Sequence, residues 1–221
     1  MRPLLSDATP EYGGTSFVET FLFDGDDRHP ATAKAVGGGS LFVFDPNASW
    51  KRIDVHREGD RTLHAYLTLS KPLDWFAGID FTDPAAATAR IAREVDGWAP
   101  ELAALITGSD TGPVHRPHYA LPVEHRWDRV AGVTLLGDAA HLQPPNGEGA
   151  NLAMQDGAEL GAAIAAHPGD IEAALTEYEQ AMFPRSAAAA AQGAAFNKVL
   201  LGDNAPQNLI GILTGSYQWS E

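Results

Sequence analysis

The stretch from Val133 to Met154 constrains the fold more than any other part of this chain. It opens with an apolar run, Val133, Leu135 and Leu136, that stops at Gly137. Such a run, ended by a glycine, predicts a short buried strand. A turn, a proline loop, a glycine-rich bend and a helix are expected to follow it.

The proline loop and the two glycines after it define the second half of this stretch. Pro144 and Pro145 can neither continue a helix nor donate to a strand ladder, so the chain is expected to be extended there. Gly147 and Gly149 allow the backbone to approach another group closely, and the helix predicted over 150–166 begins with free N–H groups. A structural strand-to-helix turn and a binding site for an anionic group are the two interpretations.

The whole string resembles the second flavin-binding motif of the FAD-dependent aromatic hydroxylases, the flavoprotein monooxygenases of the para-hydroxybenzoate hydroxylase type. The resemblance implies that Asp138 holds the ribityl chain of FAD and that the proline loop and helix start lie against the isoalloxazine ring. The backbone of Gly149, Ala150 and Asn151 would then face the flavin N1–C2=O edge. The implied cofactor-binding residues are Gly137, Asp138, Pro144, Pro145, Gly147, Gly149, Ala150 and Asn151.

Electrostatics agree with that resemblance, and one position departs from it. Reduced flavin is negatively charged near N1 and C2=O, and a helix N-terminus stabilises an adjacent anion by roughly 0.3–2 kcal/mol. Members of the family usually carry one more residue between the second proline and the Gly-x-Gly, where Asn146 stands alone here. The shorter loop is expected to change contacts in the substrate pocket rather than the family.

Length and charge exclude several classes of partner. The chain has 221 residues, enough for one large domain or two small ones. Its formal net charge of −14 argues against nucleic acid or an anionic membrane surface as partner. There are no cysteines, so disulfides and thiolate catalysis are excluded. No signal peptide and no apolar run of about 20 residues is present, which predicts a cytoplasmic protein.

The first residues, from Arg2 to Thr20, are typical of the middle of a fold. They resemble the family segment after the Asp-Gly motif that closes the dinucleotide-binding portion, above all in the tetracycline-inactivating branch. A dinucleotide site needs G-x-G-x-x-G between a strand and a helix, but the cluster Gly37–Gly39 precedes a predicted strand. The ADP-binding half of the FAD site is therefore expected to lie in a missing N-terminal segment or a partner chain. A misplaced start, a cloned piece, a split gene and a decayed gene are the alternatives.

Strands are predicted over 15–23, 40–44, 50–57 and 61–69, of which 50–57 alternates, with a hairpin turn at 58–60 and an antiparallel substrate-side sheet as the result. His64, Tyr66 and Thr68 share one face of the last strand. By resemblance, His64 matches a pocket histidine of the tetracycline-inactivating branch, and Thr20 is a weaker match. Substrate contacts are thus predicted at Thr20, His64 and Tyr66, with a solvent-facing polar strand face as the alternative.

Helical periodicity and caps predict the remaining elements. Asp83 is the expected N-cap of a helix reaching about residue 98, followed by a helix over 101–106 and an edge strand over 113–122. Asp170 is expected to cap a helix that Pro184 kinks or divides, and a last helix is predicted over 206–213. The predicted buried positions are Ala87, Ile91 and Val95, then Leu152, Leu160, Gly161 and Ile164, and finally Ile171, Leu175, Tyr178 and Met182.

No metal site and no catalytic side chain is predicted. His115, His118 and His125 lack the spacing of a ligand set on extended backbone, so packed or surface histidines are expected. Asp138 and His141 stand three apart, as an acid–base or metal pair could, but the flavin motif accounts for both, with His141 as a packing residue. G-x-S-x-G does not occur.

These patterns predict an α+β fragment of the FAD-monooxygenase fold, with a substrate-side sheet domain over 1–128 and a flavin-contacting strand–loop–helix with C-terminal helices over 129–221. The resemblance implies a monooxygenase that uses FAD and NADPH or NADH to hydroxylate an aromatic or polycyclic, tetracycline-like small molecule. The cofactor would supply the chemistry and the protein its placement. The alternative is a non-catalytic ligand-binding fragment or half-enzyme that needs an upstream segment or partner chain.

Overall fold

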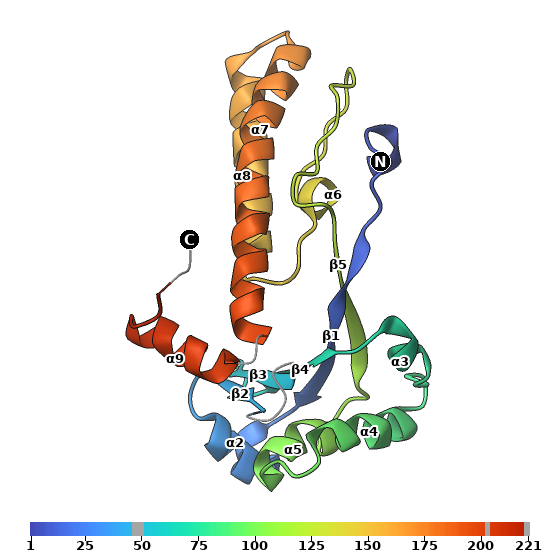
Figure 1. The fold of residues 1–221 in the computed structure, drawn as a ribbon, viewed down its shortest axis with the longest axis vertical. Helices are drawn as coiled ribbons and strands as arrows, with labels where there is room; N and C mark the ends of the chain where they lie inside the picture. The colour runs from blue at the N-terminus through green and yellow to red at the C-terminus, as the bar shows by residue number, and fades with distance from the viewer. Residues whose placement is uncertain (46–50, 202–203, 219–221) are drawn as a thin grey trace. The chain divides into compact units, whose positions relative to one another are not determined.

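The computed structural model describes residues 1–45, 51–201 and 204–218. It confirms the α+β class, with one sheet and several helices (Figure 1). In chain order the elements are η1 (Arg2–Leu4), β1 (Glu11–Leu22), α1 (Gly25–Arg28), α2 (Pro30–Val36), β2 (Ser40–Phe44), β3 (Lys51–Arg57), β4 (Leu63–Ser70), α3 (Leu73–Ala77), α4 (Pro84–Ala92), η2 (Arg93–Val95), α5 (Pro100–Thr107), β5 (Val114–Ala120), α6 (Asp138–His141), α7 (Gly149–Ala166), α8 (Ile171–Leu201) and α9 (Ala205–Thr214).

The chain divides into two compact units, each built from two separate segments. Unit 1 combines Met1–Gly13 with His118–Lys198, and unit 2 combines Gly14–Pro117 with Val199–Glu221. Strands β1 and β5 begin in one unit and end in the other. The domains expected over 1–128 and 129–221 stay a prediction.

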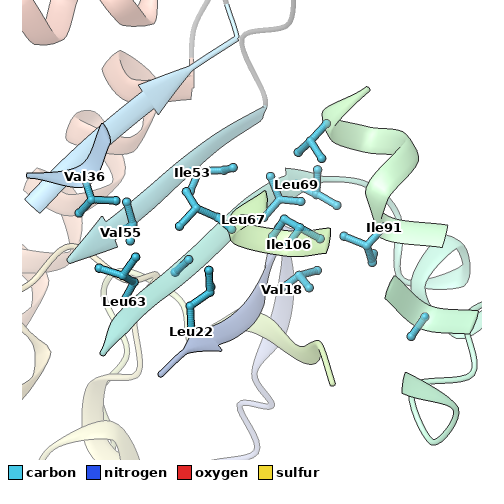
Figure 2. Packing of buried hydrophobic residues seen from close by; sticks show 14 of the residues in the cluster. Val18, Leu22, Val36, Ile53, Val55, Leu63, Leu67, Leu69, Ile91 and Ile106 are labelled. Atoms are coloured by element: carbon cyan, nitrogen blue, oxygen red, sulfur yellow. The ribbon is translucent and has the colours of Figure 1, made fainter. Parts of the chain in front are cut away.

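Unit 2 is organised around a five-stranded sheet of order β2-β3-β4-β1-β5. The pairs β2–β3, β3–β4 and β1–β4 are antiparallel, and Val18, Leu67 and Ile53 lie opposite one another in register. Opposite residues in an antiparallel pair share a face, so the alternating apolar residues meet on one side. Figure 2 shows these side chains packed with Ile91 of α4 and Ile106 of α5, and all five are fully buried.

The strands of the sheet and helix α4 in unit 2 were predicted from the sequence. Asp83 caps α4 by accepting the N–H groups of Ala85 and Ala86, each at 3.1 Å. The predicted inner positions, Ala87, Ile91 and Val95, are all buried. Helix α4 ends at Ala92, before the predicted residue 98, because the chain tightens into η2. Strand β5 lies at the sheet edge, as its prolines predicted. Residue 50 of the predicted strand 50–57 lies outside the described residues.

Helices α1, α2 and α3 were not predicted. The segment from Thr32 was expected to be mostly strands, but α2 spans Pro30–Val36. Proline at its first position suits a helix start, and Thr32, Ala33 and Val36 are buried at helical rather than alternating spacing. Three inward positions in seven residues are too few for the sequence pattern to reveal this helix.

Unit 1 contains α7 and most of the long α8, which lie side by side (Figure 1) and are joined by an ion pair between Arg185 and Asp156. Asp170 caps α8 as predicted, because its carboxylate accepts the Ala173 N–H at 3.0 Å. The helix continues through Pro184 over its full length, so Pro184 does not divide it.

Part of the predicted apolar stripe is wrong. Gly161, Ile164 and Ile171 are exposed, whereas Leu152, Leu175, Tyr178 and Met182 are buried as expected. The buried face of α7 instead carries Asp156. A pattern of apolar residues does not predict where a carboxylate is buried.

The strand predicted at 133–136 is also wrong: these residues have no strand assignment, and Leu136 is exposed. Side chains rather than a neighbouring strand bind their carbonyl groups. Arg129 Nη1 donates to the Val133 carbonyl at 2.6 Å, and the Tyr178 hydroxyl donates to the Leu135 carbonyl at 3.1 Å. An apolar run becomes a strand only where a partner strand pairs with it.

Among the described residues, no helix combines the length and the apolar character needed to cross a bilayer.

Candidate functional site

The turn at Gly137 sets the position of Asp138 in unit 1. Gly137 has φ +58° and ψ −144°, a conformation that residues with a Cβ rarely adopt. A Cβ there would also lie 3.1 Å from the Cβ of Ala153 on α7. Glycine is therefore required both by the backbone angle and by the close approach of this helix.

Asp156 anchors this turn from α7. Its side chain is fully buried, and Oδ2 accepts the Gly137 N–H at 2.8 Å and lies 2.6 Å from His141 Nε2. Arg185 Nη2 donates to Oδ1 at 2.7 Å. Burial alone would lower the pKa of Arg185, but the carboxylates of Asp156 and Glu159 outweigh it and raise that pKa. A buried charge with this many donors is satisfied, so Asp156 fixes the turn to α7 and α8.

Sequence analysis missed Asp156 as part of the site. Its one signal was a carboxylate four residues after Leu152, on the inward stripe of a predicted helix. His141, in contrast, packs within the turn as predicted, with its ring held by Asp156.

Asp138, the predicted ribityl ligand, makes hydrogen bonds through its main-chain carbonyl and not through its carboxylate in the described part of the chain. Arg2 donates to the carbonyl groups of Asp138 and Ala139 at 3.0 and 2.9 Å. The Asp138 side chain is exposed and has no hydrogen-bond partner among the described residues. It can therefore accept a hydrogen bond from a hydroxyl group of a bound molecule.

The loop before α7 is shaped by Asn146, whose Oδ1 accepts the Glu148 N–H at 2.9 Å. Gly147 follows with φ +86°. A Cβ at Gly193 of α8 would lie 2.6 Å from Asn146 Nδ2, so this glycine makes room for the amide. The single residue between the prolines and Gly147 is thus packed against α8.

The start of α7 offers free backbone donors. Its first backbone hydrogen bond joins the Leu152 N–H to the Glu148 carbonyl, which leaves the N–H groups of residues 149–151 without a partner in the part of the chain that the structure describes. No acidic side chain lies in the first turn, and nothing lies within 4 Å of where a Cβ of Gly147 or Gly149 would be. An anionic edge of a planar group can approach these donors, so the residues fit the flavin edge implied by the motif.

Gln143 is a further polar group in the same loop. Both of its amide atoms are buried and have no hydrogen-bond partner among the described residues. Buried polar groups are nearly always paired, so a bound molecule is one way to satisfy this amide. Nothing in the residue pattern distinguishes Gln143 from its neighbours in the motif.

A cavity of about 320 Å³ opens beside the helix start, within the range of small-molecule sites. It is lined by Asn146, Glu148 and Leu152 on one side and by Ala189, Gln192, Gly193 and Phe196 on α8.

The predicted substrate residues belong to unit 2, and the sheet separates them. His64 and Tyr66 lie opposite Phe21 and Glu19 on the polar face, whereas Thr20 lies opposite Ala65 on the core face. The Thr20 hydroxyl is fully buried and donates to the Leu105 carbonyl at 2.8 Å. Thr20 therefore supports the core, and it does not share a surface with His64 and Tyr66.

The polar face of this sheet combines aromatic rings with a charged pair. His64 stacks on Phe21 with ring centroids 4.1 Å apart and lies 4.4 Å from the Tyr66 ring. Burial would raise the pKa of Glu19, but hydrogen bonds from Arg116 and His64 outweigh it and lower that pKa. Burial and the neighbouring Glu19 raise the pKa of Tyr66, which keeps its hydroxyl protonated.

The remaining histidines singled out in the sequence have structural contacts. His125 lies 2.6 Å from the Ala140 carbonyl through Nδ1 and 2.9 Å from Ser6 Oγ through Nε2. His115 Nε2 lies 2.9 Å from Ser16 Oγ, and burial lowers the pKa of His115.

Comparison with known proteins gives a consistent result. Residues 120–192, which hold the motif, match the family model described as FAD binding domain. The FAD-dependent urate hydroxylase of Mycolicibacterium vanbaalenii is 39% identical over 94 residues, which are 41% of this chain and 23% of that relative.

Two solved structures show the fold. A variant of HpxO from Klebsiella pneumoniae in complex with FAD matches with a TM-score of 0.76 at 23% identity, over 97% of this chain and 53% of that one. The tetracycline destructase Tet(51) matches with a TM-score of 0.63 at 14% identity, over 97% and 56%.

The chain spans about half the length of these solved structures. It is related to the FAD-dependent monooxygenases, a family of oxidoreductases, and the predicted family and fold are confirmed at this level.

Proposed function

We propose that this relative of the FAD-dependent monooxygenases binds the ribityl–isoalloxazine part of FAD through the motif from Gly137 to Asn151. One observation carries the proposal. The unpartnered Asp138 carboxylate and the free N–H groups of residues 149–151 are held by the same helix, α7, because Asp156 ties the Gly137 turn to it. A carboxylate that accepts from hydroxyls and donors that face an anionic ring edge are the two contacts such a cofactor needs.

In this proposal each residue acts by holding or shielding the cofactor. Asp138 accepts hydrogen bonds from the ribityl hydroxyls, and the start of α7 donates to the N1–C2=O edge. Pro144, Pro145 and Gly147 form the wall beside the ring. When bound, FAD supplies electron transfer and oxygen activation, with NADPH or NADH as the source of electrons. The ADP part of FAD would be held by another segment or a partner chain.

We further propose an aromatic or polycyclic small molecule, tetracycline-like in shape, as the substrate to be hydroxylated. The support is the aromatic and polar face formed by Phe21, His64 and Tyr66, which offers stacking surfaces together with a hydroxyl that stays protonated. The cytoplasmic location remains a prediction.

The second candidate function is a ligand-binding fragment that does not turn over by itself. It is favoured by the extent of the match, since the chain spans 53% of the FAD-bound HpxO structure. In this case the sheet face of unit 2 would bind small molecules while FAD binds weakly or needs a partner chain.

Titration of the full 221-residue chain with FAD, followed by flavin fluorescence, tests the first proposal. We expect saturable binding that Asp138→Asn weakens roughly 10–150-fold, since each lost hydrogen bond to a charged group is worth roughly 1.5–3 kcal/mol. Asp128→Asn, which changes another exposed aspartate, should bind as the wild type does.

Two outcomes would count against it. Equal affinity in Asp138→Asn and the wild type would remove Asp138 from the site. No binding by the wild type would favour the fragment, and binding of FAD only after a partner segment is added would then identify a half-enzyme.

A further inference from the structure

A group of metal-ligand side chains lies at one corner of the polar sheet face in unit 2. His56 on β3 and His64 on β4 are directly opposite in register, and Glu58 follows β3 in the turn between the two strands. One ligand atom from each of the three lies within 4.8 Å of the other two. Among the described residues this is the one such group of three or more.

The distances match the spacing of ligands around one ion. Glu58 Oε1 lies 3.1 Å from His56 Nε2 and 3.4 Å from His64 Nδ1. Metal–nitrogen and metal–oxygen bonds of about 2.0–2.2 Å in a tetrahedral site place neighbouring ligand atoms roughly 3.3–3.5 Å apart. The contacts of Glu58 with both histidines are near this spacing, and all three ligand atoms lie within 4.8 Å of one another.

The other ring nitrogen of His64, Nε2, contacts a carboxylate, as the nitrogen that does not bind the metal usually does in a histidine ligand. His64 Nε2 lies 2.8 Å from Glu19 Oε1, and the other oxygen of Glu19 accepts from Arg116 at 2.8 Å. With Glu19 charged, Nε2 carries the proton and donates it. A carboxylate on the far nitrogen fixes the tautomer and leaves Nδ1 as the electron-pair donor toward the metal.

The contact between His64 Nδ1 and Glu58 Oε1 is suited to a positive charge. A neutral His64 that donates through Nε2 turns a lone pair at Nδ1 toward the Glu58 oxygen, so two acceptors face each other at 3.4 Å. A second proton on His64 or a cation between the two atoms resolves this contact. His56 and Glu58 are 41% and 45% exposed, so an ion can reach the position from solvent.

We propose that His56, Glu58 and His64 bind a divalent transition-metal ion, with Glu19 orienting His64. Two imidazoles and one carboxylate suit Zn²⁺, Co²⁺, Ni²⁺ or Cu²⁺ better than Mg²⁺ or Ca²⁺. Three protein ligands leave an open coordination position for water or for a donor atom of a bound molecule. The site stands on unit 2 alone and does not depend on FAD.

Zn²⁺ titration of the full chain by calorimetry, with Co²⁺ absorption as a second readout, tests this site. We expect one equivalent of Zn²⁺ to bind and Co²⁺ to give the intense visible bands of a four-coordinate centre. His56→Gln and His64→Asn should each abolish the Co²⁺ bands. Glu19→Gln, which leaves all three ligands in place, should weaken Zn²⁺ binding by about 10–100-fold.

His167→Gln is the matched control, because His167 also lies beside a carboxylate, at 2.6 Å from Glu177, but has no third ligand among the described residues. It should bind both metals as the wild type does. Circular dichroism of each variant identifies loss of the fold, and His56, whose side chain is more exposed than that of His64, is the histidine substitution that disturbs the sheet less. No Zn²⁺ binding by the wild type at millimolar concentration would overturn the proposal. Binding that a folded His56→Gln retains, or that His167→Gln loses, would also overturn it.

Discussion

At the scale of single residues, the two aspartates of unit 1 have opposite roles. Asp138 is exposed and its side chain has no partner among the described residues. Asp156 is fully buried, and its carboxylate contacts the Gly137 N–H, His141 and Arg185. The buried carboxylate holds the backbone turn, and in the proposed function the exposed one accepts hydrogen bonds from the cofactor. Both aspartates lie in the segment from the Gly137 turn to the end of α7, and the difference in their surroundings is burial.

Asp156→Ala should lower the free energy of unfolding by about 3–5 kcal/mol, because it leaves the Arg185 charge partly buried and the Gly137 N–H unpaired. Urea unfolding at neutral pH measures the loss. Glu159→Gln removes the more exposed partner of Arg185, 35% exposed, and should cost only about 0.2–1 kcal/mol. Similar losses in the two variants would contradict the anchoring role of Asp156.

At the scale of elements, α7 and α8 hold the loop that carries Asn146. A glycine within a helix normally costs stability, so Gly193 on α8 is explained by the space it leaves for the Asn146 amide. That amide in turn binds the Glu148 N–H just before the free donors of α7. Helix packing thus fixes the geometry of the loop.

Gly161→Ala, at an exposed helical position with no neighbour within 4 Å, should raise the free energy of unfolding by about 0.5–1 kcal/mol. Gly193→Ala should lose this gain and unfold more easily than Gly161→Ala, because its Cβ displaces the Asn146 amide. Paired thermal melts of the two variants measure the difference. Equal stabilisation would mean that Asn146 moves away from Gly193 without cost.

The sequence predicted the elements whose signals are local. All five strands were predicted, most clearly β3, where the buried Ile53 and Val55 alternate with less buried residues, and α4 was recognised because Asp83 supplies a cap. The segment 133–136 was misassigned because a strand also requires a partner, which the local pattern does not contain. Asp156 was missed because its donors, at residues 137, 141 and 185, are brought together only by the fold.

The same reasoning explains the candidate sites. The flavin motif is contiguous, so its resemblance could be recognised before the structure. The group His56, Glu58 and His64 depends on the β3–β4 register, and the sequence spacing of these residues resembles an ordinary hairpin. Thr20 shows the limit of matching single positions, since its side chain points to the core.

At the scale of the whole molecule, the acidic composition gives the protein a pH-dependent stability. Glu19, Asp60, Asp80 and Asp110 all have lowered pKa values in the folded state. For Asp110, burial would raise the pKa, but the Phe23 N–H, His29 and Arg28 outweigh it. A lowered folded-state pKa stabilises the fold above the ordinary carboxyl pKa, and this contribution is lost as the pH falls.

The free energy of unfolding should therefore decrease as the pH is lowered from about 5 to 3. Asp54, whose pKa is raised by burial against the opposing effect of Arg52, contributes in the opposite direction and only partly offsets this loss. Urea unfolding at several pH values measures the slope. Asp110→Asn should flatten it, and a slope unchanged in this variant would show that other carboxylates dominate.

The path of the chain between the two units has a consequence for how such proteins diversify. The chain leaves unit 1 after Gly13 and returns at His118, and a Cβ on Gly13 would lie 3.6 Å from the His118 carbonyl oxygen. The 104 residues of Gly14–Pro117 are thus an insertion whose two ends meet. A segment attached at neighbouring ends can be exchanged, lengthened or shortened while its anchor points stay fixed. Because the proposed substrate face lies on this insertion, we expect that grafting it between relatives would change the ligand preference on an unchanged motif.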